Sequence, residues 1–150
     1  MSNPKIRDVQ VSDRERINEI NKLISEEVRH PLSPISKDED LAFYSTVDDC
    51  EFIVAILEDI VGYIEMSYYE GDKGIMALFV HPDFRRKGIG DQLIKALILK
   101  VKEKKKYSEI YLQVKEDNAA MLLYEKNKFK KTTKEIDGGY EMVHTIEVPA

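Results

Sequence analysis

The chain of 150 residues lacks several features on which whole classes of protein depend. Its single cysteine, Cys50, can form no intrachain disulfide and cannot supply a cysteine-rich metal site. The longest apolar runs, residues 52–57 and 75–80, fall far short of the roughly 18 residues that a membrane span needs. Residues 1–5 lack the apolar core of a signal peptide. We therefore expect a soluble, cytoplasmic protein with one domain over residues 1–150 and no membrane partner.

Acidic and basic residues are distributed unevenly, although the net charge is only −5. Residues 1–84 carry 8 Lys and Arg against 18 Asp and Glu, whereas residues 85–134 carry 15 basic against 6 acidic side chains. The second half can thus hold an anionic ligand and the first half a cationic one, unless the lysines only solvate helix faces. Aromatic residues are not interleaved with the lysines in a stacking pattern, so nucleic acid is not an expected partner.

The pattern of apolar residues predicts one mixed α/β domain. Helices are expected after the start signals at Ser12 and Ser36, from residue 89 to 101, and over about residues 119–128. The predicted strands are residues 5–9, 52–57, 61–69, 75–80, 110–114, 131–136 and 140–148. The three strands between residues 52 and 80 follow one another closely and form an antiparallel meander.

Residues 78–91 are the most informative segment, because a strand leads there through a cationic loop into an amphipathic helix. Unpaired backbone amides at a helix start, together with the helix dipole, favour a phosphate. Gly88 and Gly90 would remove the Cβ atoms that keep phosphate oxygens away, although glycines also shape tight loops without any ligand. A Rossmann site would need glycine at Leu93, and no Gly-x-x-x-x-Gly-Lys-Ser/Thr segment occurs, which excludes both common nucleotide signatures.

The sequence Arg85-x-x-Gly88-x-Gly90 after a strand resembles the acyl-CoA signature Arg/Gln-x-x-Gly-x-Gly/Ala of the GNAT superfamily of N-acyltransferases. Residues 110–114 and 118–129 resemble the next strand of that superfamily, its Asn-x-x-Ala-like helix start and its Leu-Tyr-Glu-x-x-Gly-Phe ending. Lys128 stands where glycine is usual, so Asn127 is expected to take the left-handed backbone position. The resemblance implies the GNAT fold, with a mixed, mostly antiparallel central sheet and flanking helices.

The resemblance also implies acetyl-CoA as the co-substrate, held mainly by backbone groups. Residues Leu78, Phe79 and Val80 would pair with the pantetheine arm, and the amide of Val80 would polarise the thioester carbonyl. Asn118 would contact the pantetheine or the adenosine. The pyrophosphate would be bound by the amides of Arg85, Arg86, Lys87, Gly88, Ile89 and Gly90. No metal is expected, because His30, His81 and His144 are isolated in the sequence.

Tyr124 is the predicted catalytic residue, since the resemblance places it beside the sulfur of CoA. A phenol with a pKa of about 10 can donate a hydrogen bond or a proton to the departing thiolate. The alternative is an aromatic residue that only packs in the core. The general base is left open. Gln113, which cannot usefully accept a proton, stands where some relatives carry glutamate. Glu65 is the best remaining carboxylate, although a solvent-facing position is more common for such a residue, and water relayed through backbone carbonyls is the alternative.

The sequence thus predicts an N-acetyltransferase in which an amine attacks acetyl-CoA directly in a ternary complex. The acceptor would approach residues 25–40, whose acidic side chains favour a cationic amine. A peptide or protein α-amine is the first candidate acceptor, and a small-molecule amine or polyamine is the second. A non-catalytic acyl-CoA-binding module is the remaining alternative. The sequence leaves the oligomeric state open, a homodimer included.

Overall fold

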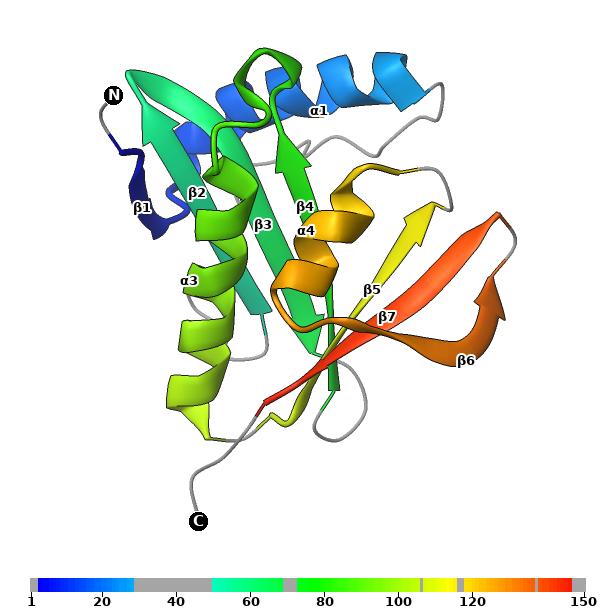
Figure 1. Cartoon of the computed structure of the whole chain (residues 1–150). Helices are drawn as coiled ribbons and strands as arrows, with labels where there is room; N and C mark the ends of the chain where they lie inside the picture. Colours follow the sequence, from blue (N-terminus) through cyan, green and yellow to red (C-terminus); the bar gives the residue numbers. More distant parts are fainter. Residues whose placement is uncertain are drawn as a thin grey trace.

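The computed structural model describes residues 3–28, 50–68, 73–105, 107–115, 118–136 and 138–146. A seven-stranded sheet runs through the molecule in the order β1-β2-β3-β4-β5-β7-β6 (Figure 1). The strands are β1 (Lys5–Asp8), β2 (Cys50–Leu57), β3 (Asp59–Tyr68), β4 (Lys73–Val80), β5 (Glu109–Lys115), β6 (Lys130–Ile136) and β7 (Gly139–Thr145). The helices are α1 (Arg14–Val28), α3 (Ile89–Lys104) and α4 (Ala120–Lys126), with 3-10 turns at Val11–Asp13 and Pro82–Phe84.

The predicted fold class, one mixed α/β domain with a mostly antiparallel sheet, is confirmed. All seven predicted strands are present, and most of their ends lie within two residues of the expected positions. The helix expected after Ser36 lies outside the described residues. None of the helices in the described ranges is long and apolar enough to cross a membrane.

Helices cover both faces of the sheet, α3 and α4 on one side and α1 on the other (Figure 1). Strand β2 shows how the sequence encodes this arrangement. Ile53 and Ala55 pack in the cluster around α3 and α4, whereas Phe52 and Val54 pack in the cluster around α1. Because successive side chains point to opposite faces and both faces are buried, this strand is apolar at four consecutive positions.

The start of α1 is fixed by an ion pair and not by the expected Ser12 cap. The carboxylate of Asp13 accepts the backbone amide of Gln10 at 2.7 Å. It also accepts both terminal nitrogens of Arg7, at 2.8 and 2.9 Å. The capping box therefore begins two residues earlier than expected, at Gln10, in the 3-10 turn that leads into α1. The ion pair of Asp13 with Arg7 ties this turn to strand β1.

The C-terminal half of α3 is tied to β2 by ion pairs. Glu51 is only 5% exposed and lies 2.5 Å from Nζ of Lys104 and 3.6 Å from Nζ of Lys100. Lys100 also pairs with Asp8 of β1. Lys100 and Lys104 thus have specific carboxylate partners in addition to the favourable helix dipole.

Substitution of Leu97 should test the packing of α3 against the sheet. Leu97 is 0% exposed, so Leu97→Ala should leave a cavity and lower the free energy of unfolding by about 2–5 kcal/mol. Urea unfolding measures this change. Leu99→Ala on the same helix is the matched control, because Leu99 is 58% exposed and its loss should cost less than about 0.5 kcal/mol. Equal losses for the two variants would contradict the observed orientation of α3.

Candidate active site

Strands β4 and β5 are parallel neighbours, and their pairing ends early. It joins Lys73, Gly74 and Ile75 to Glu109, Ile110 and Tyr111. Beyond these pairs the two strands diverge, and α4 lies over the opening (Figure 1). We call the facing, unpaired edges of residues 76–80 and 112–115 the β4–β5 split. Such an edge offers backbone donors and acceptors to an extended ligand, and ligands commonly bind at the carboxyl ends of parallel strands.

The backbone of β4 alternates between β3 and the split. The amide of His81 donates to the carbonyl of Val61 on β3 at 2.8 Å. Because backbone groups alternate sides along a strand, Phe79 also faces β3, whereas Leu78 and Val80 face the split. The expectation that backbone groups of all three residues reach the pantetheine therefore does not hold for Phe79.

Val80 presents one backbone donor at the split. Its carbonyl accepts Nε of Arg85 at 3.2 Å, and its amide lies on the same side of the strand. In the part of the chain that the structure describes, no strand pairs with this amide. Arg85 thus draws the following loop back onto β4, while the Val80 amide faces the split.

The loop that follows β4 ends at the N-terminus of α3. Two of its residues adopt positive φ, 63° at Arg86 and 80° at Gly88. The first helical hydrogen bond runs from the amide of Gln92 to the carbonyl of Gly88 at 3.1 Å. The amides of residues 89–91 precede this bond and have no partner within the helix. These donors lie beside the exposed cations of residues 85–87, as the sequence predicts.

Gly88 and Gly90 are glycines for different reasons. Gly88 has a φ of +80°, and a Cβ there would meet nothing within 4 Å. A Cβ on Gly90 would lie 2.9 Å from Cδ2 of Leu123 and 3.3 Å from Cδ2 of Leu78. Gly90 therefore clears space for the close approach of α4 and β4 to α3, a reason that the sequence does not predict.

Tyr124 lies on the buried side of α4. It is 7% exposed, and its ring contacts that of Phe129 edge to face with 5.9 Å between centroids. Its hydroxyl makes no hydrogen bond to any residue in the described ranges. Burial raises the pKa of Tyr124 to about 12, so the hydroxyl keeps its proton throughout the neutral range.

Asn127 joins three elements at the end of α4. Its Nδ2 donates to Oδ1 of Asp91 on α3 at 2.9 Å and to the carbonyl of Leu123 at 3.0 Å. Its own carbonyl accepts Nδ1 of His144 on β7 at 2.9 Å. Asn127 has a φ of −93°, and Lys128 has a φ of 67°. The expectation that Asn127 takes the left-handed position is therefore wrong, since Lys128 adopts it in place of the usual glycine.

Asn118 starts α4 where strand β5 has just ended. Its Oδ1 accepts the amide of Ala120 at 2.8 Å, and its carbonyl accepts the amide of Met121 at 3.1 Å. The side chain therefore caps the helix, as asparagine commonly does. It is exposed, at the carboxyl end of β5 and hence at the edge of the split.

Glu65 lies on the face of the sheet that α1 covers. It pairs in register with Ala77 of β4 and follows Tyr63, which packs in the α1 cluster, by two residues. Glu65 is half-buried, and burial raises the pKa of its carboxyl. The expectation that Glu65 faces the solvent is therefore wrong. Gln113, the other residue considered at the position of the base, is exposed.

Within the described residues, no cluster of three or more His, Cys, Asp and Glu side chains could hold a metal ion.

Comparison with known families identifies the chain's class. Residues 48–131 match the family model described as the acetyltransferase (GNAT) domain, which is more than half of the chain. The chain therefore belongs to the GNAT acetyltransferases. Its class is that of acyl-CoA-dependent N-acyltransferases, and neighbours of the same fold were solved with coenzyme A or acetyl-CoA bound.

Individual relatives agree with this class. A curated acetyltransferase of Pectobacterium atrosepticum is 41% identical over 86 residues, a match that spans 53% of this chain and 57% of that protein. A GNAT acetyltransferase structure from Streptococcus pneumoniae has a TM-score of 0.84 and 18% identity, covering 96% of this chain and 99% of that one. The PaiA N-acetyltransferase from Thermoplasma acidophilum, solved with coenzyme A, has a TM-score of 0.80 and 20% identity, covering 97% and 99% of the two chains.

A third structure is the ribosomal-protein-S18-alanine N-acetyltransferase from Escherichia coli. Its TM-score is 0.73 at 19% identity, with 98% of this chain and 96% of that chain covered. At these identities the structural matches establish the fold that the two chains share.

Proposed function

We propose that this protein transfers the acetyl group of acetyl-CoA to the α-amino group of a peptide or protein, by direct attack of the amine in a ternary complex. The observation that carries the proposal is the β4–β5 split, with the Val80 amide at its edge and free helix-start amides at its carboxyl end. The extended pantetheine arm would add to the edge of β4 at Leu78 and Val80, as a strand adds to an open sheet. The Val80 amide would then donate to the thioester oxygen, where negative charge develops during attack.

The pyrophosphate of CoA would occupy the start of α3. The positive φ of Arg86 and Gly88 turns the loop, and residues 89–91 contribute unpaired amides. Arg86 and Lys87 are exposed and add charge-assisted contacts. Asn118, across the split, would meet the pantetheine or the adenosine. A relative of the same fold, PaiA from Thermoplasma acidophilum, was solved in complex with coenzyme A, which supports this cofactor.

Tyr124 would act on the departing CoA thiolate. A thiol has a pKa of about 8.5, against about 12 for Tyr124, so complete proton transfer would be uphill by about 5 kcal/mol. The hydroxyl would therefore stabilise the thiolate mainly as a hydrogen-bond donor. Its burial strengthens such a bond, because few water molecules compete for the thiolate there.

The choice of acceptor depends on the available base. An α-amine with a pKa of about 8 is about one tenth neutral at pH 7, whereas lysine, at about 10.4, is neutral to about four parts in ten thousand. A carboxylate is an intrinsically weak base, and burial raises the pKa of the candidate base Glu65. An acceptor whose pKa lies close to neutrality is therefore favoured. The fold neighbour from Escherichia coli, an S18-alanine N-acetyltransferase, is consistent with a peptide acceptor.

Binding of CoA at the start of α3 should depend on the charge at position 88. Gly88→Asp places a carboxylate beside the pyrophosphate and should abolish the rise in melting temperature that CoA produces in the native protein. Gly88→Asn is the matched control, because asparagine tolerates positive φ and adds no charge. It should keep most of the CoA shift. An unchanged shift in a folded Gly88→Asp protein would contradict the phosphate assignment.

Tyr124→Phe should separate catalysis from packing. The substitution keeps the ring contact with Phe129 and removes the hydroxyl alone, so the fold and acetyl-CoA binding should persist. Turnover, followed by release of free thiol, should fall by about 10²-fold. A variant with the wild-type kcat would return Tyr124 to a purely structural role.

Acceptor preference is tested by direct competition. A peptide with a free N-terminus should be acetylated faster at pH 7 than its N-blocked, lysine-bearing counterpart at the same concentration, as mass spectrometry can measure. Faster acetylation of the lysine peptide would refute the α-amine assignment. If neither peptide nor a panel of small amines releases thiol from acetyl-CoA, the proposed activity itself fails.

The same assay examines Glu65 as the base. Glu65→Gln keeps the side-chain shape but cannot accept a proton, so kcat should fall and the loss of activity on acidification should disappear. In the wild type this loss should begin above the ordinary glutamate pKa of 4.5, because burial raises the pKa and a base must be deprotonated. Glu103→Gln, at an exposed position of α3, is the control and should leave the pH profile unchanged.

A further inference from the structure

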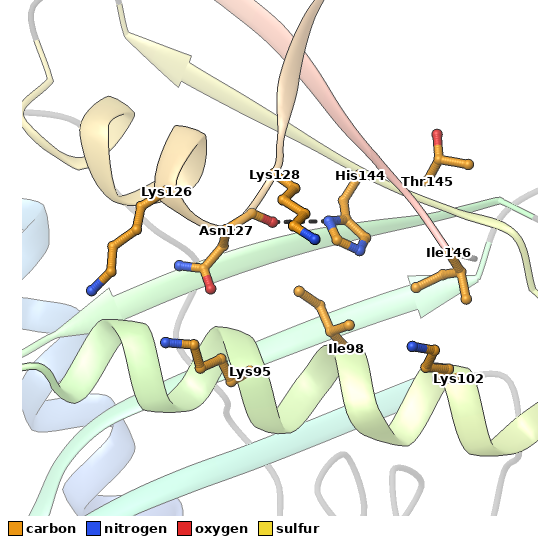
Figure 2. A pocket seen from close by; sticks show the side chains of 9 residues that line it. All are labelled: Lys95, Ile98, Lys102, Lys126, Asn127, Lys128, His144, Thr145 and Ile146. Carbon is orange, nitrogen blue, oxygen red and sulfur yellow. Dashed lines mark hydrogen bonds between the residues drawn. The ribbon is translucent and has the colours of Figure 1, made fainter. Parts of the chain in front are cut away.

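A second concave site lies away from the β4–β5 split, between α3, the segment after α4, and β7 (Figure 2). It is a pocket of about 290 Å³ whose lining contains no acidic residue. The lining residues are Lys95, Ile98, Lys102, Lys126, Asn127, Lys128, His144, Thr145 and Ile146. The proposed acetyl transfer uses none of these side chains.

Two of the four lysines in the lining share one carboxylate, and the other two have none in the described part of the chain. Asp91, which stands outside the lining, accepts Nζ of Lys95 at 2.6 Å and lies 3.7 Å from Nζ of Lys126. Lys102 on α3 and Lys128 on the opposite wall have no carboxylate within ion-pair distance among the described residues. Two uncompensated cations therefore face the same hollow from different elements.

His144 lies in the pocket, and the two cations affect its pKa. Its Nδ1 lies 2.9 Å from the carbonyl of Asn127 and must carry the hydrogen, because a carbonyl only accepts. Figure 2 shows the ring beside Lys128 and above Ile98. Burial lowers the pKa of His144, and the positive charges of Lys128 and Lys102 lower it further. Hydrogen bonds to the backbone of Asn127 and Lys128 raise the pKa, but the net shift is downward. Both cations thus act on one group inside the pocket.

We propose that this pocket binds a small multivalent anion of the phosphate type, with Lys102 and Lys128 as its main contacts. The mutual repulsion of the cations is relieved when an anion lies between them, and Ile98 and Ile146 form the apolar part of the wall. A volume of about 290 Å³ lies near the lower end of small-molecule sites, which run from roughly 300 Å³ upwards. The size suits a di- or triphosphate group, whereas a nucleic-acid strand would need an extended groove.

Calorimetric titration with tripolyphosphate tests the proposal. The whole protein is first saturated with CoA, so that the start of α3 is occupied, and is held at about 0.15 M salt. Wild type should bind one tripolyphosphate, and the imidazole resonances of His144 should shift on binding. The double variant K102Q/K128Q should bind at least about tenfold more weakly, since two charge-assisted contacts are lost.

Three further proteins make the result specific. K5Q/K22Q removes the same charge from two exposed lysines outside the pocket and should bind like the wild type. Lys128→Arg keeps the cation and should retain binding of tripolyphosphate. Lys128→Glu should abolish this binding, because it removes one cation and places a carboxylate opposite Lys102. All four substituted positions are exposed, and thermal melting should verify that each variant is folded.

Several outcomes would overturn the proposal. Unchanged binding by K102Q/K128Q would remove these residues from the site. An equal loss in K5Q/K22Q would show that the anion senses only the overall charge. Absence of binding at millimolar tripolyphosphate would also refute the proposal. A single-stranded oligonucleotide that binds the wild type more tightly than tripolyphosphate, and does not bind K102Q/K128Q, would show that the surface serves nucleic acid.

Discussion

The early end of the pairing between β4 and β5 is the constraint on which the rest of the molecule depends. A parallel pair requires a crossover, which α3 provides, and this crossover places a helix N-terminus at the carboxyl end of β4. The divergence leaves backbone groups of β4 without a strand partner. In the proposed complex, recognition of the cofactor through these backbone groups would put little demand on side chains.

In the proposed reaction, burial gives Tyr124 two roles that need not compete. The contacts that make it part of the core also remove water from its hydroxyl and raise its pKa. Glu65 is half-buried on the other face of the sheet, beneath α1. In the proposed reaction, the CoA sulfur and the amine therefore meet from opposite faces of the sheet, at the place where the sheet opens.

Periodicity and short motifs predicted the order of elements, the amphipathic α3 and the cationic loop before it, because these depend on local sequence. The physical reason for Gly90 could not be predicted, since its contact with Leu123 exists only after α3 and α4 have packed. Strand register determines that the backbone of Phe79 faces β3 and that Glu65 shares the face of the sheet on which α1 packs. Nothing local distinguishes Asn127 as the residue that joins α3, α4 and β7.

The hydrogen bonds of Asn127 also bear on how the product leaves. A helix that closes over a ligand usually moves about a hinge, and the opening of such a lid often limits turnover. Here the end of α4 is bonded to α3 and to β7 at once, so a swing of α4 would break both connections. The helix that carries Tyr124 therefore belongs to the rigid frame. In the proposed reaction, CoA would then leave by breaking its own contacts with this frame.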